Sequence, residues 1–146
     1  MPRSLGLSHV AMSVPEGTLT NEYRARLLEF YGRLLAWREM ASLRRPDRLT
    51  IAVGDSSYIN VRERADSMVS HGYEHFGVLV RSAEELQQLW AELASERFDV
   101  QLEPLSTNDG GEGSYRFRYL LPMAVEVEVQ YYAQLAAGAV ESPDAL

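Results

Sequence analysis

The sequence predicts an α+β fold in which one strand–helix–three-strand unit occurs twice. Its hydrophobic patterns run strand, helix and three candidate strands, and then the same order starts again. Two polar pairs follow this repeat. His9 and His75 lie 66 positions apart, each in the first strand of its copy, and Asn60 and Glu128 lie 68 positions apart, each in the last strand. The repeat therefore predicts two related modules.

The module boundaries follow from the polar composition of the segment ADSMVSHG. We expect one domain over 1–146, with module one at about 5–64, a linker at about 65–71 and module two at about 72–133. Residues 134–146 are small and polar, which predicts a flexible tail.

The elements of module one each have a local signal. The stretch LSHVAMSVP at 7–15 alternates between apolar and polar positions like a strand. A helical period follows over 22–40, with Thr20 or Asn21 as the N-cap. RLTIAVG and SSYINVRER predict two further strands, because a Gly-Asp turn separates them.

Module two repeats these signals. YEHFGVLV at 73–80 predicts a strand, and the capping-box sequence SAEE opens a predicted helix at 83–98. The segments DVQLEPL, SYRFRYLLP and AVEVEVQYY predict the remaining strands. Trp37 and Trp90 are predicted to lie on the two helices and to pack in the core, because aromatic side chains supply large buried areas.

Composition narrows the range of functions. The formal net charge is -7, which disfavours nucleic acid as a partner, and no apolar run is long enough to predict a membrane span. The N-terminus lacks the apolar stretch of a secretory signal, so we expect a cytoplasmic protein. The chain has no cysteine, and any transition metal must therefore be held by His, Asp or Glu.

The histidine pair is the candidate metal site. A single buried histidine is usually structural, but two at equivalent points of a repeat favour a shared role. If the last strand of each module lies beside the first, Glu128 comes close to the two histidines and is the candidate third ligand. Glu126, two residues earlier on the same strand face, is the alternative third ligand. Two imidazoles and one carboxylate leave open positions on Fe, Mn, Ni, Co or Zn, where a substrate oxygen can bind.

Four stretches together resemble the vicinal oxygen chelate superfamily, which includes glyoxalase I, bleomycin-binding proteins, fosfomycin-resistance transferases and extradiol dioxygenases. They are LSHVAMSVP, LLEFYGRLLAWRE, YEHFGVLV and LLPMAVEVEVQYY, spread over residues 5–132. The resemblance implies two βαβββ modules that form a cupped, barrel-like mixed β-sheet with flanking helices. It also implies a homodimer.

The resemblance also assigns roles to residues. It implies that His9, His75 and Glu128 are the metal ligands, with Asn60 as a weak fourth ligand where many glyoxalases have glutamate. It places Arg118 among substrate-contacting residues, and Tyr58 faces inward as a candidate for acid/base chemistry. Arginines in the pocket would suit an anionic small-molecule substrate, although they could instead balance the acidic surface.

The implied function is a metalloenzyme that resembles glyoxalases or dioxygenases and acts on a small oxygen-chelating substrate. One alternative is a metal-free protein that binds a drug or metabolite, as the bleomycin-resistance proteins do. Another is a fosfomycin-resistance-type transferase that opens an epoxide. Ala11 counts against that second alternative, because those enzymes have a threonine two residues after the first histidine.

Overall fold

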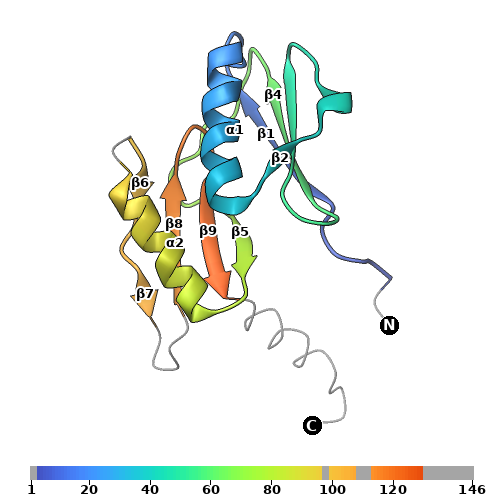
Figure 1. Ribbon diagram of the computed structural model, residues 1–146. Coiled ribbons are helices and arrows are strands. Elements are labelled where there is room, and N and C mark those ends of the chain that lie inside the picture. Colours follow the sequence, from blue (N-terminus) through green and yellow to red (C-terminus); the bar gives the residue numbers. More distant parts are fainter. Residues whose placement is uncertain (1–2, 97–98, 108–112, 130–146) are drawn as a thin grey trace. The chain divides into compact units, whose positions relative to one another are not determined.

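The computed structural model describes residues 3–96, 99–107 and 113–129, which form two compact units divided between residues 70 and 71 (Figure 1). Each unit contains one module of the predicted type, and the α+β class with two similar modules is confirmed. The predicted flexible tail, 134–146, lies outside the described residues.

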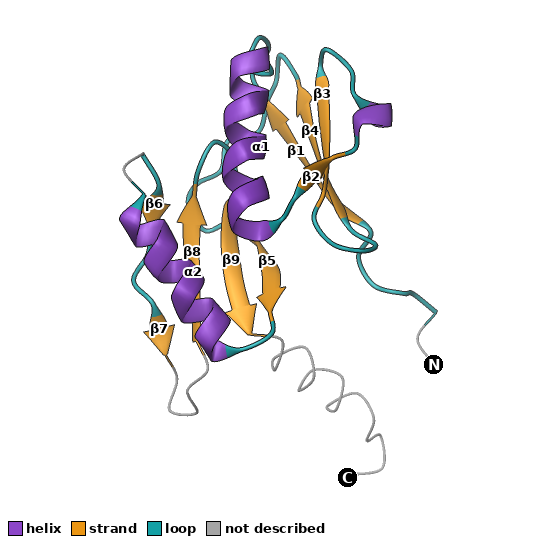
Figure 2. Ribbon diagram, viewed as in Figure 1, coloured by secondary structure: helices purple, strands orange, loops and turns teal. Residues whose placement is uncertain are grey.

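The first unit is a four-stranded mixed sheet with one long helix (Figure 2). Its elements are β1 (His9–Val14), α1 (Asn21–Leu35), β2 (Arg38–Glu39), the 3-10 turn η1 (Ala41–Leu43), β3 (Arg48–Ala52) and β4 (Tyr58–Glu63). The sheet order is β1-β4-β3-β2, and the first strand pairs in parallel with the last. The β3–β4 hairpin is antiparallel, as the Gly-Asp turn predicted.

The second unit repeats this arrangement. Its elements are β5 (His75–Val80), α2 (Ala83–Ser95), β6 (Gln101–Leu102), β7 (Ser106–Thr107), β8 (Gly113–Arg118) and β9 (Ala124–Val129). The strand order is β5-β9-β8-β6, with the short β7 also paired to β8. Again the first strand pairs in parallel with the last, so both modules share one topology.

Both helices begin where the sequence predicts. The Thr20 hydroxyl accepts a hydrogen bond from the Tyr23 amide at 3.1 Å, and the Ser82 hydroxyl accepts one from the Glu85 amide at 3.1 Å. The Glu85 carboxylate accepts in turn from the Arg81 amide at 2.9 Å. These side chains satisfy amide groups that a helix start leaves without partners.

The end of α1 differs from the prediction. Ala36 adopts a left-handed conformation with φ of 58°, and its amide donates to the Gly32 carbonyl. The helix therefore ends at Leu35, five residues before the predicted end. Trp37 therefore lies beyond the helix, and the prediction that places it on a helix is wrong. It is still buried, because its ring stacks on Tyr31 with centroids 4.7 Å apart. Trp90 does lie on α2, but it is half-buried and its indole nitrogen donates to the Glu103 carbonyl.

Each sheet has one buried and one open face. Successive strand residues point to opposite faces, and the apolar ones gather on the face that the module's helix covers. In the first unit this buried layer contains Met12, Val14, Leu49, Ile51, Ile59 and Val61 with Leu27, Phe30 and Tyr31 of α1. In the second it contains Tyr115, Phe117, Val125, Val127 and Val129 with Leu86, Leu89 and Leu93 of α2.

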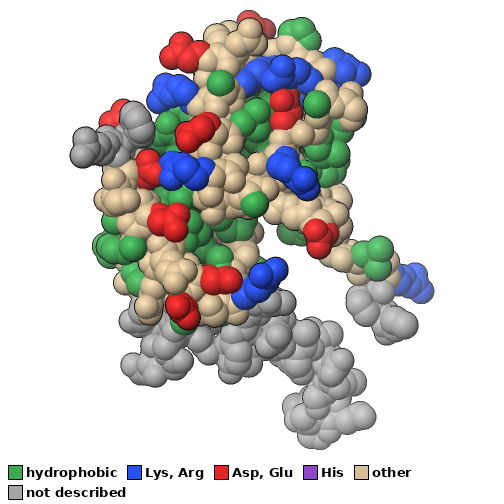
Figure 3. Space-filling model, in the orientation of Figure 1, with side chains coloured by type: hydrophobic (Ala, Val, Ile, Leu, Met, Phe, Trp, Pro, Cys, Tyr) green, Lys and Arg blue, Asp and Glu red, His purple; other side chains and the backbone are tan. Residues whose placement is uncertain are grey.

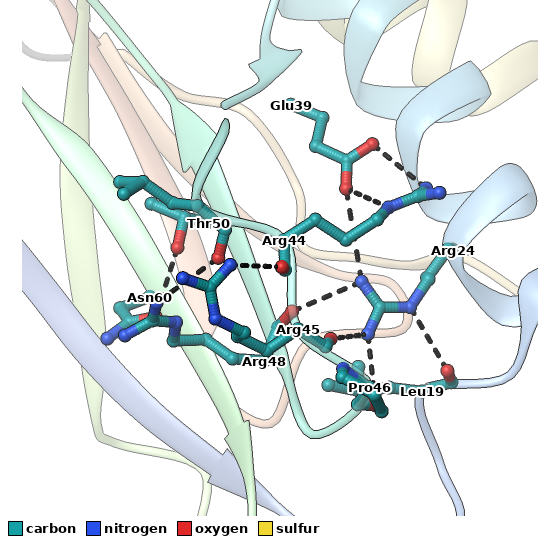
Figure 4. A network of polar contacts seen from close by, with 10 residues as sticks. Leu19, Arg24, Glu39, Arg44, Arg45, Pro46, Arg48, Thr50 and Asn60 are labelled. Atoms are coloured by element: carbon teal, nitrogen blue, oxygen red, sulfur yellow. Dashed lines mark hydrogen bonds and ion pairs between the residues drawn. The ribbon is translucent and has the colours of Figure 1, made fainter. Parts of the chain in front are cut away.

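A buried arginine joins α1 to the loop before β3 (Figure 4). Arg24 is 4% exposed, and its guanidinium donates to the carbonyls of Leu19, Arg45, Pro46 and Arg48 at 2.6 to 3.2 Å. Glu39 lies 3.9 Å away and also accepts two hydrogen bonds from Arg44. Because so many of its donors are satisfied, Arg24 can remain charged in the interior and fix the start of β3.

Within the described parts of the chain, neither helix has the length and apolar character that crossing a membrane requires.

Replacing Arg24 with alanine should destabilise the protein by roughly 3–5 kcal/mol, because four carbonyls would each lose a hydrogen bond and Glu39 would lose a buried ion-pair partner. Urea unfolding measures this loss. The matched control is Arg33→Ala, since Arg33 is an exposed residue of the same helix that forms an ion pair with Glu29 one helical turn away. That control should change stability by less than about 0.5 kcal/mol. Equal effects of the two substitutions would contradict the role given to Arg24.

Candidate functional site

The open face of the first sheet carries the predicted polar residues of module one. The register aligns His9 with Tyr58, Ala11 with Asn60 and Ser13 with Arg62 across β1 and β4. These residues alternate with the buried apolar ones and share the face opposite the core. The structure therefore brings together His9, Tyr58 and Asn60 as neighbours on one surface.

His9 is the first residue of β1, and its ring is held from two sides. The imidazole stacks on Tyr58 with centroids 4.7 Å apart and planes within 7° of parallel. Its Nδ1 lies 2.8 Å from the Ser8 hydroxyl. These contacts orient the imidazole on an exposed strand end. Asn60 lies one row further along, where its Oδ1 accepts a hydrogen bond from the buried Thr50 hydroxyl at 3.3 Å.

His75 is the first residue of β5 and has a defined tautomer. Its Nδ1 lies 2.6 Å from the Tyr73 carbonyl, which only accepts, so Nδ1 must carry a proton. Its Nε2 lies 2.7 Å from a carboxylate oxygen of Glu126. A neutral imidazole would direct a lone pair at that carboxylate. At this distance the contact is favourable when a proton lies between the two atoms.

Glu128 lies next to this pair on the open face of β9. Burial raises the pKa of its carboxyl, the charge of Glu126 raises it further, and the nearby His75 partly offsets the shift. The carboxylate extends over Gly77, where an added Cβ would lie 3.9 Å from its Oε2. Glu126 and His75 thus both act on the Glu128 carboxyl from the same face of this strand pair.

The register identifies Glu126, and not Glu128, as the counterpart of Asn60. Ala11 lies opposite Asn60, and Gly77, the equivalent residue two positions after the second histidine, lies opposite Glu126. Asn60 and Glu126 are also 66 positions apart, the same separation as the two histidines. The sequence therefore contained a signal for Glu126, namely this 66-residue separation. The pairing of Asn60 with Glu128, which are 68 positions apart, overlooked it.

The predicted faces of β8 are confirmed. Arg116 and Arg118 alternate with the buried Tyr115 and Phe117, and they share the open face with His75. Arg116 lies opposite Glu126 and forms an ion pair with Glu103 at 3.2 Å. Arg118 follows Phe117, which pairs with Val125, so it lies beside Ala124 in the row of His75.

No three side chains of His, Asp or Glu among the described residues lie close enough together to hold a metal ion by themselves. His75, Glu126 and Glu128 belong to the second unit, and His9, Tyr58 and Asn60 to the first. Each unit therefore presents part of the predicted donor set on its own open face.

Comparison with solved structures identifies the fold. The fosfomycin resistance protein FosX from Listeria monocytogenes, complexed with Mn(II) and sulfate, is 16% identical, with 86% of this chain and 90% of that one covered and a TM-score of 0.63. Lactoylglutathione lyase from Agrobacterium tumefaciens is 15% identical, with 88% and 96% covered and a TM-score of 0.63. A glyoxalase/bleomycin resistance protein from Albidiferax ferrireducens is 12% identical, with 84% and 97% covered and a TM-score of 0.59. No family model and no curated protein sequence matches the chain.

The raised pKa of Glu128 predicts a pH-dependent cost to stability. The folded protein holds the Glu128 proton more tightly than the unfolded chain does, so stability falls as pH rises from the unfolded value of about 4.3 through the raised folded value. In the metal-free protein, Glu128→Gln should raise the melting temperature at pH 7, and this gain should vanish near pH 4. Thermal melts at both pH values measure it.

The matched control for that melt is Glu29→Gln, which removes an exposed carboxylate of α1. It should leave the melting temperature nearly unchanged at both pH values. A Glu128→Gln variant that is less stable than wild type at pH 7 would show that the ionised carboxylate is stabilising, contrary to the environment described.

Proposed function

We propose that this chain, which has the fold of the vicinal oxygen chelate superfamily, is a metalloenzyme that resembles glyoxalases or dioxygenases. In this proposal His9, His75 and a glutamate of β9 bind one divalent metal ion, and the substrate is a small molecule that chelates the metal through oxygen. The protein acts as a homodimer. The observation that carries the proposal is the contact between His75 and Glu126.

That contact has the features of a metal-ligand pair. A ligating histidine usually donates its second ring nitrogen to a carbonyl, as His75 does to Tyr73, and this leaves Nε2 directed at the open face. The 2.7 Å between Nε2 and Oε2 is a hydrogen-bond distance, and the two atoms would need to separate to about 3 Å or more to become adjacent ligands on one metal ion. A divalent cation there would take the place of the shared proton.

Either carboxylate of β9 can complete the pair. The resemblance assigns the role to Glu128, whose raised pKa reflects a repulsion that a cation would relieve. The short distance to His75 and the 66-residue spacing support Glu126. Asn60 has an amide oxygen engaged by Thr50, which makes it at most a weak ligand.

The chemistry follows from these residues. A bound divalent cation would polarise a substrate oxygen and stabilise the negative charge that develops on it. Tyr58 lies against the His9 ring, where its hydroxyl can donate a proton or a hydrogen bond to substrate. Arg118 lies in the row of His75, where its guanidinium can orient an anionic group.

The known neighbours agree with this class of activity. Their names describe a lyase, a glyoxalase-type protein and a fosfomycin resistance protein crystallised with Mn(II). For this chain Ala11 stands opposite Asn60 and provides no hydroxyl beside His9, which favours the glyoxalase or dioxygenase class over the epoxide-opening class.

Titration calorimetry with Mn²⁺ and Zn²⁺ tests the metal site. The wild type should bind one ion per chain, and His9→Ala and His75→Ala should each weaken binding at least tenfold, because each removes a ligand. Glu126→Gln and Glu128→Gln are compared in the same titration. The carboxylate ligand is the glutamate whose substitution lowers metal affinity more. Sedimentation of the same samples should give a dimer of the 16.5 kDa chain.

The control is His71→Ala, since His71 precedes β5 and its backbone amide donates to Glu74. It should leave metal affinity unchanged. A wild-type protein that binds neither metal, yet binds a small molecule equally well after EDTA treatment, would contradict the proposal and favour the metal-free binding class.

A further inference from the structure

The open face of the first sheet carries an arginine on three of its four strands. The register places Arg38 of β2, Arg48 of β3 and Arg62 of β4 on this face together with His9. The two carboxylates of these four strands, Glu39 and Glu63, alternate to the other side, where their register partners are Ile51 and Val14. The strand residues of this face therefore include three cations and no anion.

The charge of the whole unit agrees with this. Residues 1–70 contain 10 arginines against 8 Asp and Glu, a net charge of +2, whereas residues 71–146 contain 4 against 13, a net charge of -9. Arginine side chains also gather over the first unit in the view of Figure 3. In an acidic protein, the first unit is the part that attracts anions.

Arg48 and Arg62 are direct register partners across β3 and β4. Like charges at directly opposed positions on one sheet face repel each other and destabilise the pairing. Asp47 offsets this repulsion through an ion pair with Arg62 at 3.7 Å, in which both side chains are more than half exposed. Such an exposed pair is weak and easily exchanged.

The guanidinium of Arg48 is also incompletely paired. One Nη donates to the Leu43 carbonyl at 3.2 Å, but Nε is shielded from solvent and has no hydrogen-bond partner. A buried donor without an acceptor carries a cost, and Arg48 would escape that cost if its side chain turned outward to meet an oxyanion. The backbone at this point is rigid, because the Arg48 carbonyl accepts from the buried Arg24 (Figure 4).

We propose that Arg48 and Arg62 form a clamp for an oxyanion, either a phosphate or a carboxylate group. This inference rests on the proposed function only in taking that group to be part of the substrate. Arg62 lies four residues along the sheet from the row of His9, a distance of about 13 Å. The structure thus points to an elongated substrate with its chelating oxygens near His9 and an anionic group at the other end of the strands.

Titration with inorganic phosphate tests the clamp. In metal-free ¹⁵N-labelled protein, the arginine Nε–Hε resonances of Arg48 and Arg62 should shift together and saturate, because both guanidinium groups contact one anion. Arg62→Gln should weaken phosphate binding at least tenfold. Arg48→Lys, which keeps the charge but loses the planar fork, should weaken it less. A parallel titration with acetate shows whether the site prefers a phosphoryl or a carboxylate group.

Two further variants serve as matched controls. Arg33→Gln changes an arginine of α1 that is paired with Glu29, and it should leave phosphate affinity unchanged. Asp47→Asn removes the competing carboxylate and should strengthen phosphate binding. Thermal melts of each variant establish that it is folded.

Phosphate shifts that do not saturate, or that are equal at Arg33 and Arg62, would overturn the clamp. So would unchanged phosphate affinity in a folded Arg62→Gln variant. Because the titration contains no metal, this failure is distinct from failure of the metal site. Binding of metal without binding of phosphate would support the proposed function and contradict the clamp. Binding of phosphate without binding of metal would support the clamp and contradict the proposed function.

Discussion

The parallel pairing of the first and last strand in each module is the constraint on which the rest of the structure depends. Because side chains alternate along a strand, this register decides which residues share a face. It aligns His9 with Tyr58 in one module and His75 with Ala124 in the other, and it sets Glu126 within reach of the His75 ring. A slip of one residue would move every polar side chain of the strand into the core.

The fold was largely predictable because its signals are local. Strand alternation, the Thr20 and Ser82 caps and the Gly-Asp turn each depend on neighbouring residues, and each is found where expected. The end of α1 was not predictable in this way, because apolar residues continue past Leu35. Its end depends on the left-handed Ala36 and on the stacking of Trp37 against Tyr31.

The site was predictable only in part. Alternation placed His9, Tyr58 and Asn60 on one face and His75, Glu128 and Arg118 on the other module's open face. The contact of His75 with Glu126 could not be predicted in this way, because it depends on the register between two strands and the pattern of one strand does not contain that register. The arginine pair of β3 and β4 depends on hairpin register, and the anchoring by Arg24 depends on the path of a loop.

The two open faces have different chemistry. One carries imidazole with crowded carboxylates, which suits a cation, and the other carries imidazole with arginines, which suits an anion. The arginines of the first sheet give a chain with a net charge of -7 one surface that attracts anions locally.

The central claim is that the two modules supply one histidine each to the same metal ion. Long-range ¹H–¹⁵N spectra of the histidine rings, recorded as Zn²⁺ is added, test it most directly. The account predicts that the ring nitrogens of His9 and His75 shift together and reach their end points at one equivalent, while those of His71 do not move. Shifts confined to His75, or shared equally by all three histidines, would contradict it.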